Sequence, residues 1–116
     1  TIISSVTGED ENASTGTGKI TFRMPYAMTL TDVRASVKTA PTGATIICDL
    51  NESGSTVLST KVSIDAGEET STTAATPPVI SDSALADDAE MTIDVDQVGS
   101  GTAGVGLKVY LIGKRA

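Results

Sequence analysis

Apolar and polar residues alternate with a period of two along most of this chain. Two segments near its end show the pattern best, each with three apolar residues spaced two apart: Met91, Ile93 and Val95, then Leu107, Val109 and Leu111. Successive side chains of a β-strand point to opposite faces, so this period is typical of a strand with one buried face. The sequence therefore predicts two strands here, joined by a glycine-rich connection.

Shorter segments of the same kind precede these two. In chain order, we expect strands at residues 19–24, 28–37, 45–50, 56–64, 70–75 and 79–80. The clearest hairpin joins 45–50 to 56–64 through a loop rich in turn residues. A total of about seven or eight short strands, separated by frequent turns, is typical of a sandwich. We therefore expect an all-β fold, an antiparallel β-sandwich that is jelly-roll-like.

The strand expected at 28–37 contains a change of phase. Met28 and Leu30 lie at even positions, whereas Val33 and Ala35 lie at odd positions. A regular strand would place the two pairs on opposite faces. A β-bulge or a bend near Thr31–Asp32 would return them to one face, so we expect such a feature there.

The first residues are organised differently. Apolar Ile2, Ile3 and Val6 precede a polar, glycine-containing stretch. We expect an extended N-terminal arm and loop at residues 1–18, followed by a single β-sandwich domain at 19–116. Such an arm either frays or docks on a neighbouring subunit. If it docks, Ile2, Ile3 and Val6 are the expected assembly contacts.

Composition and charge narrow the classes of partner. Only 3% of the 116 residues are aromatic, so the core must be built from aliphatic side chains and methionine. The net charge is −7 and the basic residues are scattered, which opposes binding to phosphate-rich chains. No apolar run is long enough for a membrane-spanning helix. We therefore expect neither a nucleic acid nor a membrane as partner.

One segment, Gly99–Gly104, matches the pattern G-x-G-x-x-G literally. In a nucleotide-binding fold a helix follows these glycines directly, because the helix N-terminus receives the pyrophosphate. Here the next residues, 105–109, alternate like a strand. We therefore expect a connection between antiparallel strands, or else a glycine loop shaped to meet another subunit.

Other candidate chemistry is sparse. The chain contains no histidine, which excludes the Ser-His-Asp and Cys-His arrangements of nucleophilic enzymes. Cys48 shares its strand face with Ile46 and Leu50, so we expect a buried structural thiol. Six acidic residues are expected to form a solvated face rather than a calcium site: Asp82, Asp87, Asp88, Glu90, Asp94 and Asp96. No catalytic residue, cofactor or metal is expected.

Several phrases of the chain, taken together, resemble the small structural proteins and modules of tailed bacteriophages: Phe22–Tyr26, Val33–Val37, Ala40–Gly43, Asn51–Gly54, Ile93–Gly99 and Gly106–Val109. The resemblance spans residues 20–113. It implies a non-enzymatic β-sandwich virion protein, similar to the capsid decoration (cement) proteins, which are often trimeric. The implied partners are the major capsid protein and copies of the chain itself, on the outer capsid surface.

An alternative within the same resemblance is a head- or tail-fibre β module for host-surface adhesion. Such a module would bind carbohydrate, and sugar-binding surfaces usually carry exposed aromatic side chains. Only Tyr26 and Tyr110 are candidates for that role in this chain. The acidic surface fits a protein outside the shell, away from the packaged DNA.

Overall fold

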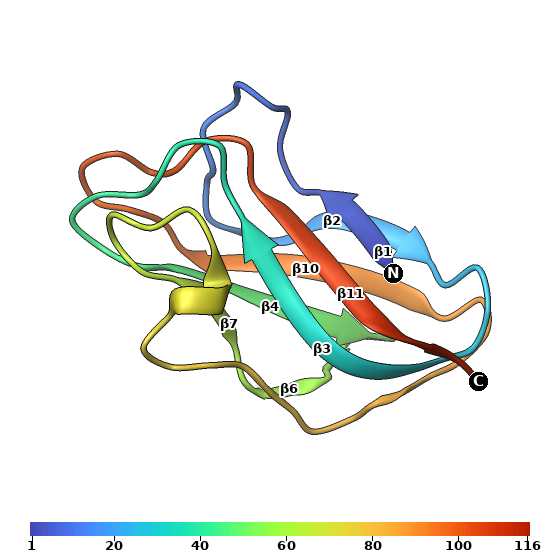
Figure 1. Cartoon of the computed structure of the whole chain (residues 1–116). Helices are drawn as coiled ribbons and strands as arrows, with labels where there is room; N and C mark the ends of the chain where they lie inside the picture. Colours follow the sequence, from blue (N-terminus) through green and yellow to red (C-terminus); the bar gives the residue numbers. More distant parts are fainter.

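In the computed structural model, which describes all residues 1–116, most of the chain forms antiparallel β-strands (Figure 1). The strands are β1 (Ile2–Ser5), β2 (Gly16–Arg23), β3 (Met28–Ser36), β4 (Ile46–Glu52), β5 (Ser55–Thr56), β6 (Leu58–Thr60), β7 (Val62–Ile64), β8 (Val79–Ile80), β9 (Ala84–Leu85), β10 (Glu90–Gln97) and β11 (Lys108–Arg115). The helical content is one 3-10 turn, η1 (Ser71–Thr73), so no helix is long enough to cross a membrane. The expected all-β fold is confirmed, with more strands than expected.

Two main sheets make a sandwich-like arrangement. One has the strand order β1-β11-β3-β9, and the other has the order β2-β10-β4-β5, with β7 also paired to β4. A small third sheet joins β6 to β8. Figure 1 shows β1, β11 and β3 in front of β2, β10 and β4. The strands β10 and β11 therefore lie in different sheets, and the glycine-rich segment between them crosses from one sheet to the other.

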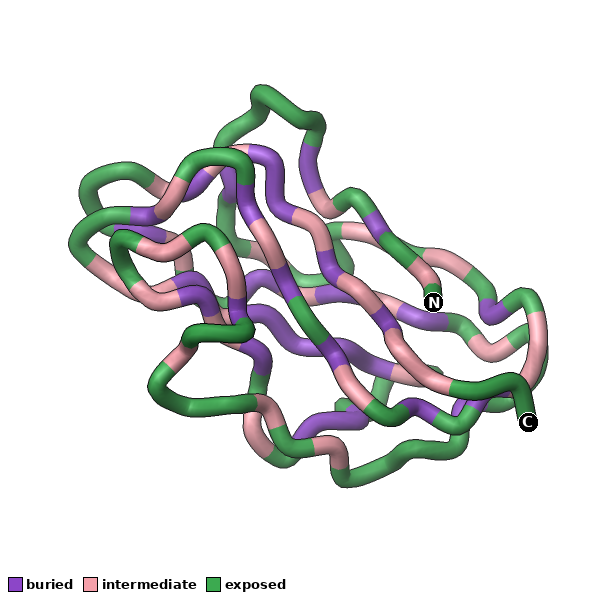
Figure 2. Tube along the Cα trace, viewed as in Figure 1, coloured by how far each residue is buried: buried purple, intermediate pink, exposed green.

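The core lies between the two main sheets. Its members are aliphatic residues, three methionines and one cysteine: Ala13, Met24, Met28, Leu30, Val33, Ala35, Val37, Ile46, Cys48, Leu50, Val57, Leu58, Val62, Ile64, Leu85, Met91, Ile93, Val95, Leu107, Val109 and Leu111. Figure 2 shows buried and more exposed residues alternating along the long strands. Phe22 and Tyr26 pack only partly against this core. The alternation seen in the sequence thus reports correctly which face of each long strand is buried.

The phase change in β3 is a β-bulge. Asp32 pairs with Ile112 of β11, and Leu30 pairs with the next residue, Gly113. Thr31 is therefore the extra residue, and its Oγ1 donates a hydrogen bond to the Ile112 carbonyl at 3.1 Å. The apolar residues before and after the bulge are all buried on one face. This confirms the bulge expected from the sequence.

The N-terminal residues differ from the separate arm expected at 1–18. β1 pairs with β11 in antiparallel register, with Ile2 opposite Leu111 and Ser5 opposite Lys108. Residues 2–5 are thus an edge strand of the sandwich, and β2 already begins at Gly16. A pattern of alternation indicates which face is buried but not which strand supplies the partner, so it does not distinguish an intramolecular edge strand from an arm.

Two segments in the middle of the chain also differ from expectation. Residues 56–64 were expected as one strand, but β5 and β7 pair with β4 while β6 pairs with β8. Consecutive Val57 and Leu58 are both buried, which one straight strand cannot achieve in a single core. The prediction of a strand at 70–75 is wrong, because these residues contain the 3-10 turn η1.

Candidate functional site

The glycine-rich segment 99–104 packs against the loop that joins β3 to β4. The Thr42 N–H donates to the Thr102 carbonyl at 2.9 Å, and the Gly101 N–H donates to the Thr42 carbonyl at 2.9 Å. The Thr102 N–H donates to Thr42 Oγ1 at 2.6 Å. A Cβ placed on Gly99 would collide with the Thr102 carbonyl oxygen. The glycines thus allow two backbones to approach closely, and the loop uses its amide groups internally.

The acidic side chains of β10 contact other parts of the second sheet. Asp94 accepts hydrogen bonds from the Gly18 N–H at 2.7 Å and from Asn51 Nδ2 at 3.0 Å. Asp96 accepts one from Lys61 Nζ at 2.5 Å, and this bond raises the pKa of Lys61. No group of three histidine, cysteine or acidic residues is placed to hold a metal ion. Asp94 and Asp96 link β10 to its neighbours.

The single cysteine, Cys48, lies in the core with 1% of its surface exposed. Burial raises the pKa of its thiol to about 12, and the nearby Asp96 and Asp49 carboxylates add to the rise. The thiolate is the reactive form of cysteine, so this side chain stays protonated and unreactive at neutral pH. The expected buried thiol is confirmed.

Of the three expected assembly contacts, only Ile3 is well exposed. Ile2 and Val6 are half-buried and pack against the core, whereas 59% of the Ile3 surface is exposed. β1 pairs with β11 alone and forms one end of its sheet. The other edge of β1 therefore presents backbone N–H and C=O groups to solvent. β1 combines an open strand edge with an exposed apolar side chain.

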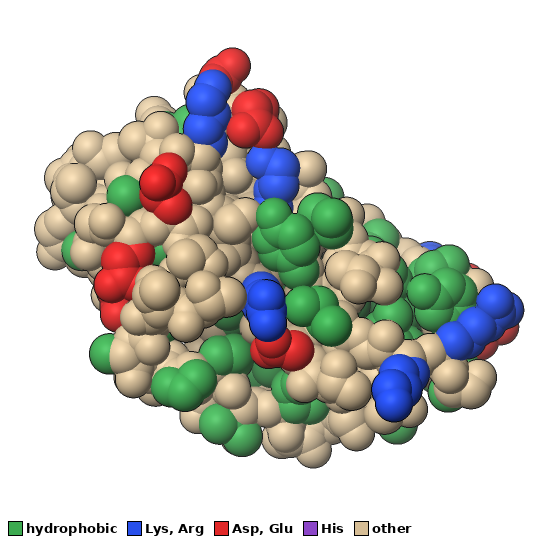
Figure 3. Space-filling view, viewed as in Figure 1, with side chains coloured by type: hydrophobic (Ala, Val, Ile, Leu, Met, Phe, Trp, Pro, Cys, Tyr) green, Lys and Arg blue, Asp and Glu red, His purple; other side chains and the backbone are tan.

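Ile3 belongs to an apolar row on the outer face of the front sheet. It lies opposite Tyr110 of β11, which in turn lies opposite Arg34 of β3. Ile112 lies on the same face of β11, and both it and Tyr110 are half-buried. Figure 3 shows hydrophobic side chains gathered over β1 and β11 on this face. The Tyr110 hydroxyl and Ser36 Oγ form a hydrogen bond of 2.9 Å, which fixes the ring.

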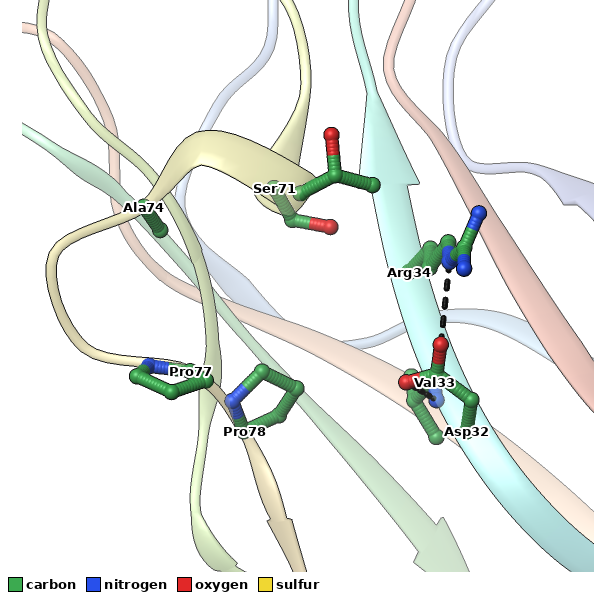
Figure 4. A pocket seen from close by; sticks show the side chains of 8 residues that line it. Asp32, Val33, Arg34, Ser71, Ala74, Pro77 and Pro78 are labelled. Carbon is green, nitrogen blue, oxygen red and sulfur yellow. Dashed lines mark hydrogen bonds and ion pairs between the residues drawn. The ribbon is translucent and has the colours of Figure 1, made fainter.

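A pocket of about 290 Å³ opens beside this row, between β3 and residues 71–78 (Figure 4). It is lined by polar groups and proline rings: Asp32, Val33, Arg34, Ser71, Thr72, Ala74, Pro77 and Pro78. Figure 4 shows Asp32 and Arg34 on β3, with Ser71 and the two prolines on the facing segment. Asp32 Oδ2 accepts a hydrogen bond from Arg34 Nε at 2.9 Å. This pair forms one wall of the pocket.

A second hollow, of about 500 Å³, lies over the other sheet. Its lining is almost entirely polar: Thr45, Ile47, Ser59, Thr60, Lys61, Ser63, Asp65, Thr76 and Gln97. Most of its charged and amide groups already have protein partners. Gln97 Nε2 donates to the Thr45 carbonyl at 2.8 Å, and Asp65 Oδ2 accepts from the Ala75 N–H at 2.9 Å. This hollow offers a ligand few unused polar groups.

Sequence reasoning did not find the pocket, because its residues form no motif. Asp32 and Arg34 look like ordinary outward residues of a strand, and Pro77–Pro78 looks like a strand breaker. The one available signal was the bulge beside Asp32, since bulges often re-aim side chains near functional sites. Comparisons with known proteins gave no match: no family model, no curated protein and no solved structure corresponds to this chain.

Proposed function

We propose that this chain is a non-enzymatic structural protein of a bacteriophage virion, a capsid decoration protein that binds the outer capsid surface and stabilises the shell. The observation that carries the proposal is β1, an edge strand with one open side and an Ile3 side chain 59% exposed. Such an edge accepts a strand of a partner through main-chain hydrogen bonds. The partner classes, the major capsid protein and further copies of this chain, come from the sequence resemblance.

The energetics of such a contact favour an assembled shell. Complete burial of an isoleucine side chain is worth about 1.5–3 kcal/mol, so covering the exposed part of Ile3 contributes about 1–2 kcal/mol. The same contact recurs at every symmetric position of a capsid. A net charge of −7 suits the outer surface, where the protein does not meet packaged DNA.

Purified particles of the phage that encodes the chain test the proposal directly. Mass spectrometry should detect the chain in the particles, and a cryo-EM map should place it on the outer surface. Absence of the chain from the particles would overturn the proposal. Light scattering on the purified protein tests for the self-association, expected as a trimer, that the resemblance implies.

A matched pair of variants tests the role of Ile3. Ile3 and Val79 are the two large apolar side chains that the fold leaves well exposed, at 59% and 50%. Ile3→Thr and Val79→Thr each keep a β-branched side chain while removing apolar surface. In co-sedimentation with undecorated capsids, we expect Ile3→Thr to bind about tenfold more weakly and Val79→Thr to bind like the wild type. Equal binding by both variants would exclude Ile3 from the interface.

A further inference from the structure

The edge of β3 that faces away from β11 is covered along most of its length. β9 pairs with Met28–Thr29 at its beginning. Near the end of β3, η1 and the residues just before it cover the same edge. There, Ser71 Oγ accepts a hydrogen bond from the Ala35 N–H at 2.9 Å. Val33 lies between the part of the edge covered by β9 and the part covered by η1. No neighbouring strand pairs with this edge at Val33, and the pocket opens there.

At Val33 a side chain, and not a neighbouring strand, binds the main-chain amide. The Val33 N–H donates to Asp32 Oδ1 at 2.8 Å, so a side chain takes the place of a partner strand. In an antiparallel ladder the N–H and C=O of one residue point to the same side, so the Val33 carbonyl also faces the pocket. The Asp32 carboxylate and the Val33 carbonyl therefore place hydrogen-bond acceptors on this wall of the pocket.

Arg34 supplies the complementary donors. Its Nε is bound to Asp32, but its two terminal nitrogens donate to no protein atom. Half of this side chain is exposed, at 53%, and the Asp32 side chain is 39% exposed. Donors and acceptors thus alternate along one wall, with the positive and negative charges balanced. An arrangement of this kind suits hydroxyl groups, which donate and accept together.

The facing wall is mixed in character. Pro77 and Pro78 have no N–H and present their rings, and Ala74 adds a methyl group, whereas Ser71 and Thr72 add hydroxyl groups at one end. A ligand here would meet apolar surface on one side and hydrogen-bonding groups on the other.

We propose that this pocket binds one neutral sugar residue of a glycan. A sugar ring carries hydroxyl groups around its rim and C–H groups on its faces, which matches the two walls. The volume of about 290 Å³ lies just below the usual range of small-molecule sites, about 300–1,000 Å³, which suits a ligand of one ring. An anionic ligand is disfavoured, because Asp32 lines the pocket and the whole chain carries a charge of −7.

Amide chemical shifts of the isotope-labelled protein test the proposal. A panel of neutral hexoses and N-acetylhexosamines is titrated, with inorganic phosphate as the anionic probe. We expect saturable shifts at Val33, Arg34, Ser71 and Thr72 with at least one neutral sugar. Arg34→Gln should weaken that binding about tenfold or more, since a hydrogen bond to a charged group is worth about 1.5–3 kcal/mol.

The chain offers a matched control for these variants. Lys61 and Asp96 form an ion pair of similar exposure, 44% and 36%, on the other sheet. Lys61→Gln should leave sugar binding unchanged. The proposal is overturned if no neutral sugar gives saturable shifts, if the shifts map to the hollow near Lys61, or if phosphate binds at the pocket instead. Capsid binding through Ile3 does not require Arg34, so the two proposals fail separately.

Discussion

Replacing Gly99 with alanine tests whether the glycine-rich segment is required by packing. Gly99 does not have a positive φ, so an alanine here meets no backbone strain of its own. Its Cβ would instead overlap the Thr102 carbonyl oxygen and lie 2.9 Å from the Thr42 nitrogen. Both atoms belong to backbone and join each other in a hydrogen bond of 2.9 Å. The two loops must therefore separate to admit the methyl group.

The expected loss of stability follows from these contacts. Crowding a well-packed site costs about 1–3 kcal/mol, and the loss of one or two loop hydrogen bonds adds about 0.5–1.5 kcal/mol each. We expect Gly99→Ala to lower the free energy of unfolding by about 1.5–6 kcal/mol. For a chain of this length each kcal/mol lowers the melting temperature by about 4 °C, so the expected fall is about 6–24 °C.

Two other glycines serve as controls in the same circular-dichroism melts. Gly8, like Gly99, does not have a positive φ, and a Cβ there would lie 3.7 Å from the nearest atom, so Gly8→Ala should change stability by less than about 0.5 kcal/mol. Gly54 has φ +86° but open space around it, so Gly54→Ala should show backbone strain alone, about 1–2 kcal/mol. At about 4 °C per kcal/mol, a difference of about 2 °C corresponds to about 0.5 kcal/mol. If the melting temperatures of Gly99→Ala and Gly8→Ala differ by less than that, the packing argument is refuted.

Three further predictions concern the core and the bulge. Burial raises the pKa of the Cys48 thiol from 9.0 to about 12, so the folded chain holds this proton more tightly than the unfolded chain does. Relative to Cys48→Val, the wild type should lose about 1.4 kcal/mol of stability at pH 10 and about 2.7 kcal/mol at pH 11 in urea unfolding, and parallel pH profiles would contradict this. Ile93 is fully buried, so Ile93→Ala should cost about 2–5 kcal/mol in the same assay, and a loss below about 1 kcal/mol would mean that the core collapses around the change. Deletion of Thr31 should turn Met28 and Leu30 outward and abolish cooperative melting, and an unchanged melt would show that the bulge is dispensable.

The features predicted correctly from the sequence are those that depend on one strand at a time. Alternation indicates which side chains share a face, and that indication held for Met91, Ile93 and Val95 of β10. The bulge in β3 was also predictable, because one extra residue inverts the parity of the apolar positions within a single strand. Both features depend only on the sequence of residues within one strand, so they can be predicted from it.

Strand partners depend on distant parts of the chain, and the sequence did not predict them. β10 and β11 are adjacent in sequence, yet β10 pairs with β2 and β4, while β11 pairs with β1 and β3. Every residue except proline has the same main-chain donor and acceptor, so the pattern of side chains along a strand says little about which other strand it pairs with. The change of partner at β6, which pairs with β8 and not with β4, does have a local signal in the sequence. Val57 and Leu58 are consecutive apolar residues that are both buried, which indicates a kink in the strand.

The pocket was hidden for a related reason. It exists where two covering segments, β9 and η1, both stop short of Val33. Nothing in the local sequence indicates where a distant loop ends, so the opening beside Val33 could not be predicted. The sequence pattern predicts a strand at Ser71, whereas in the structure the Ser71 side chain replaces a strand carbonyl as the acceptor for the Ala35 N–H. Side-chain substitutes of this kind are visible only in three dimensions.

The edge of β1 is treated differently from the edges of β2 and β3. Open edges invite pairing with other chains, and proteins commonly protect them with charged side chains or covering loops. β2, the edge of the second sheet, carries the exposed charges of Lys19 and Arg23. β3 is covered by β9 and η1, and Asp32 caps the amide that remains. β1 consists of Ile2–Ser5, has no charged residue and exposes an isoleucine. The proposed pairing with a partner strand therefore uses an edge that neither a charged side chain nor a covering segment protects.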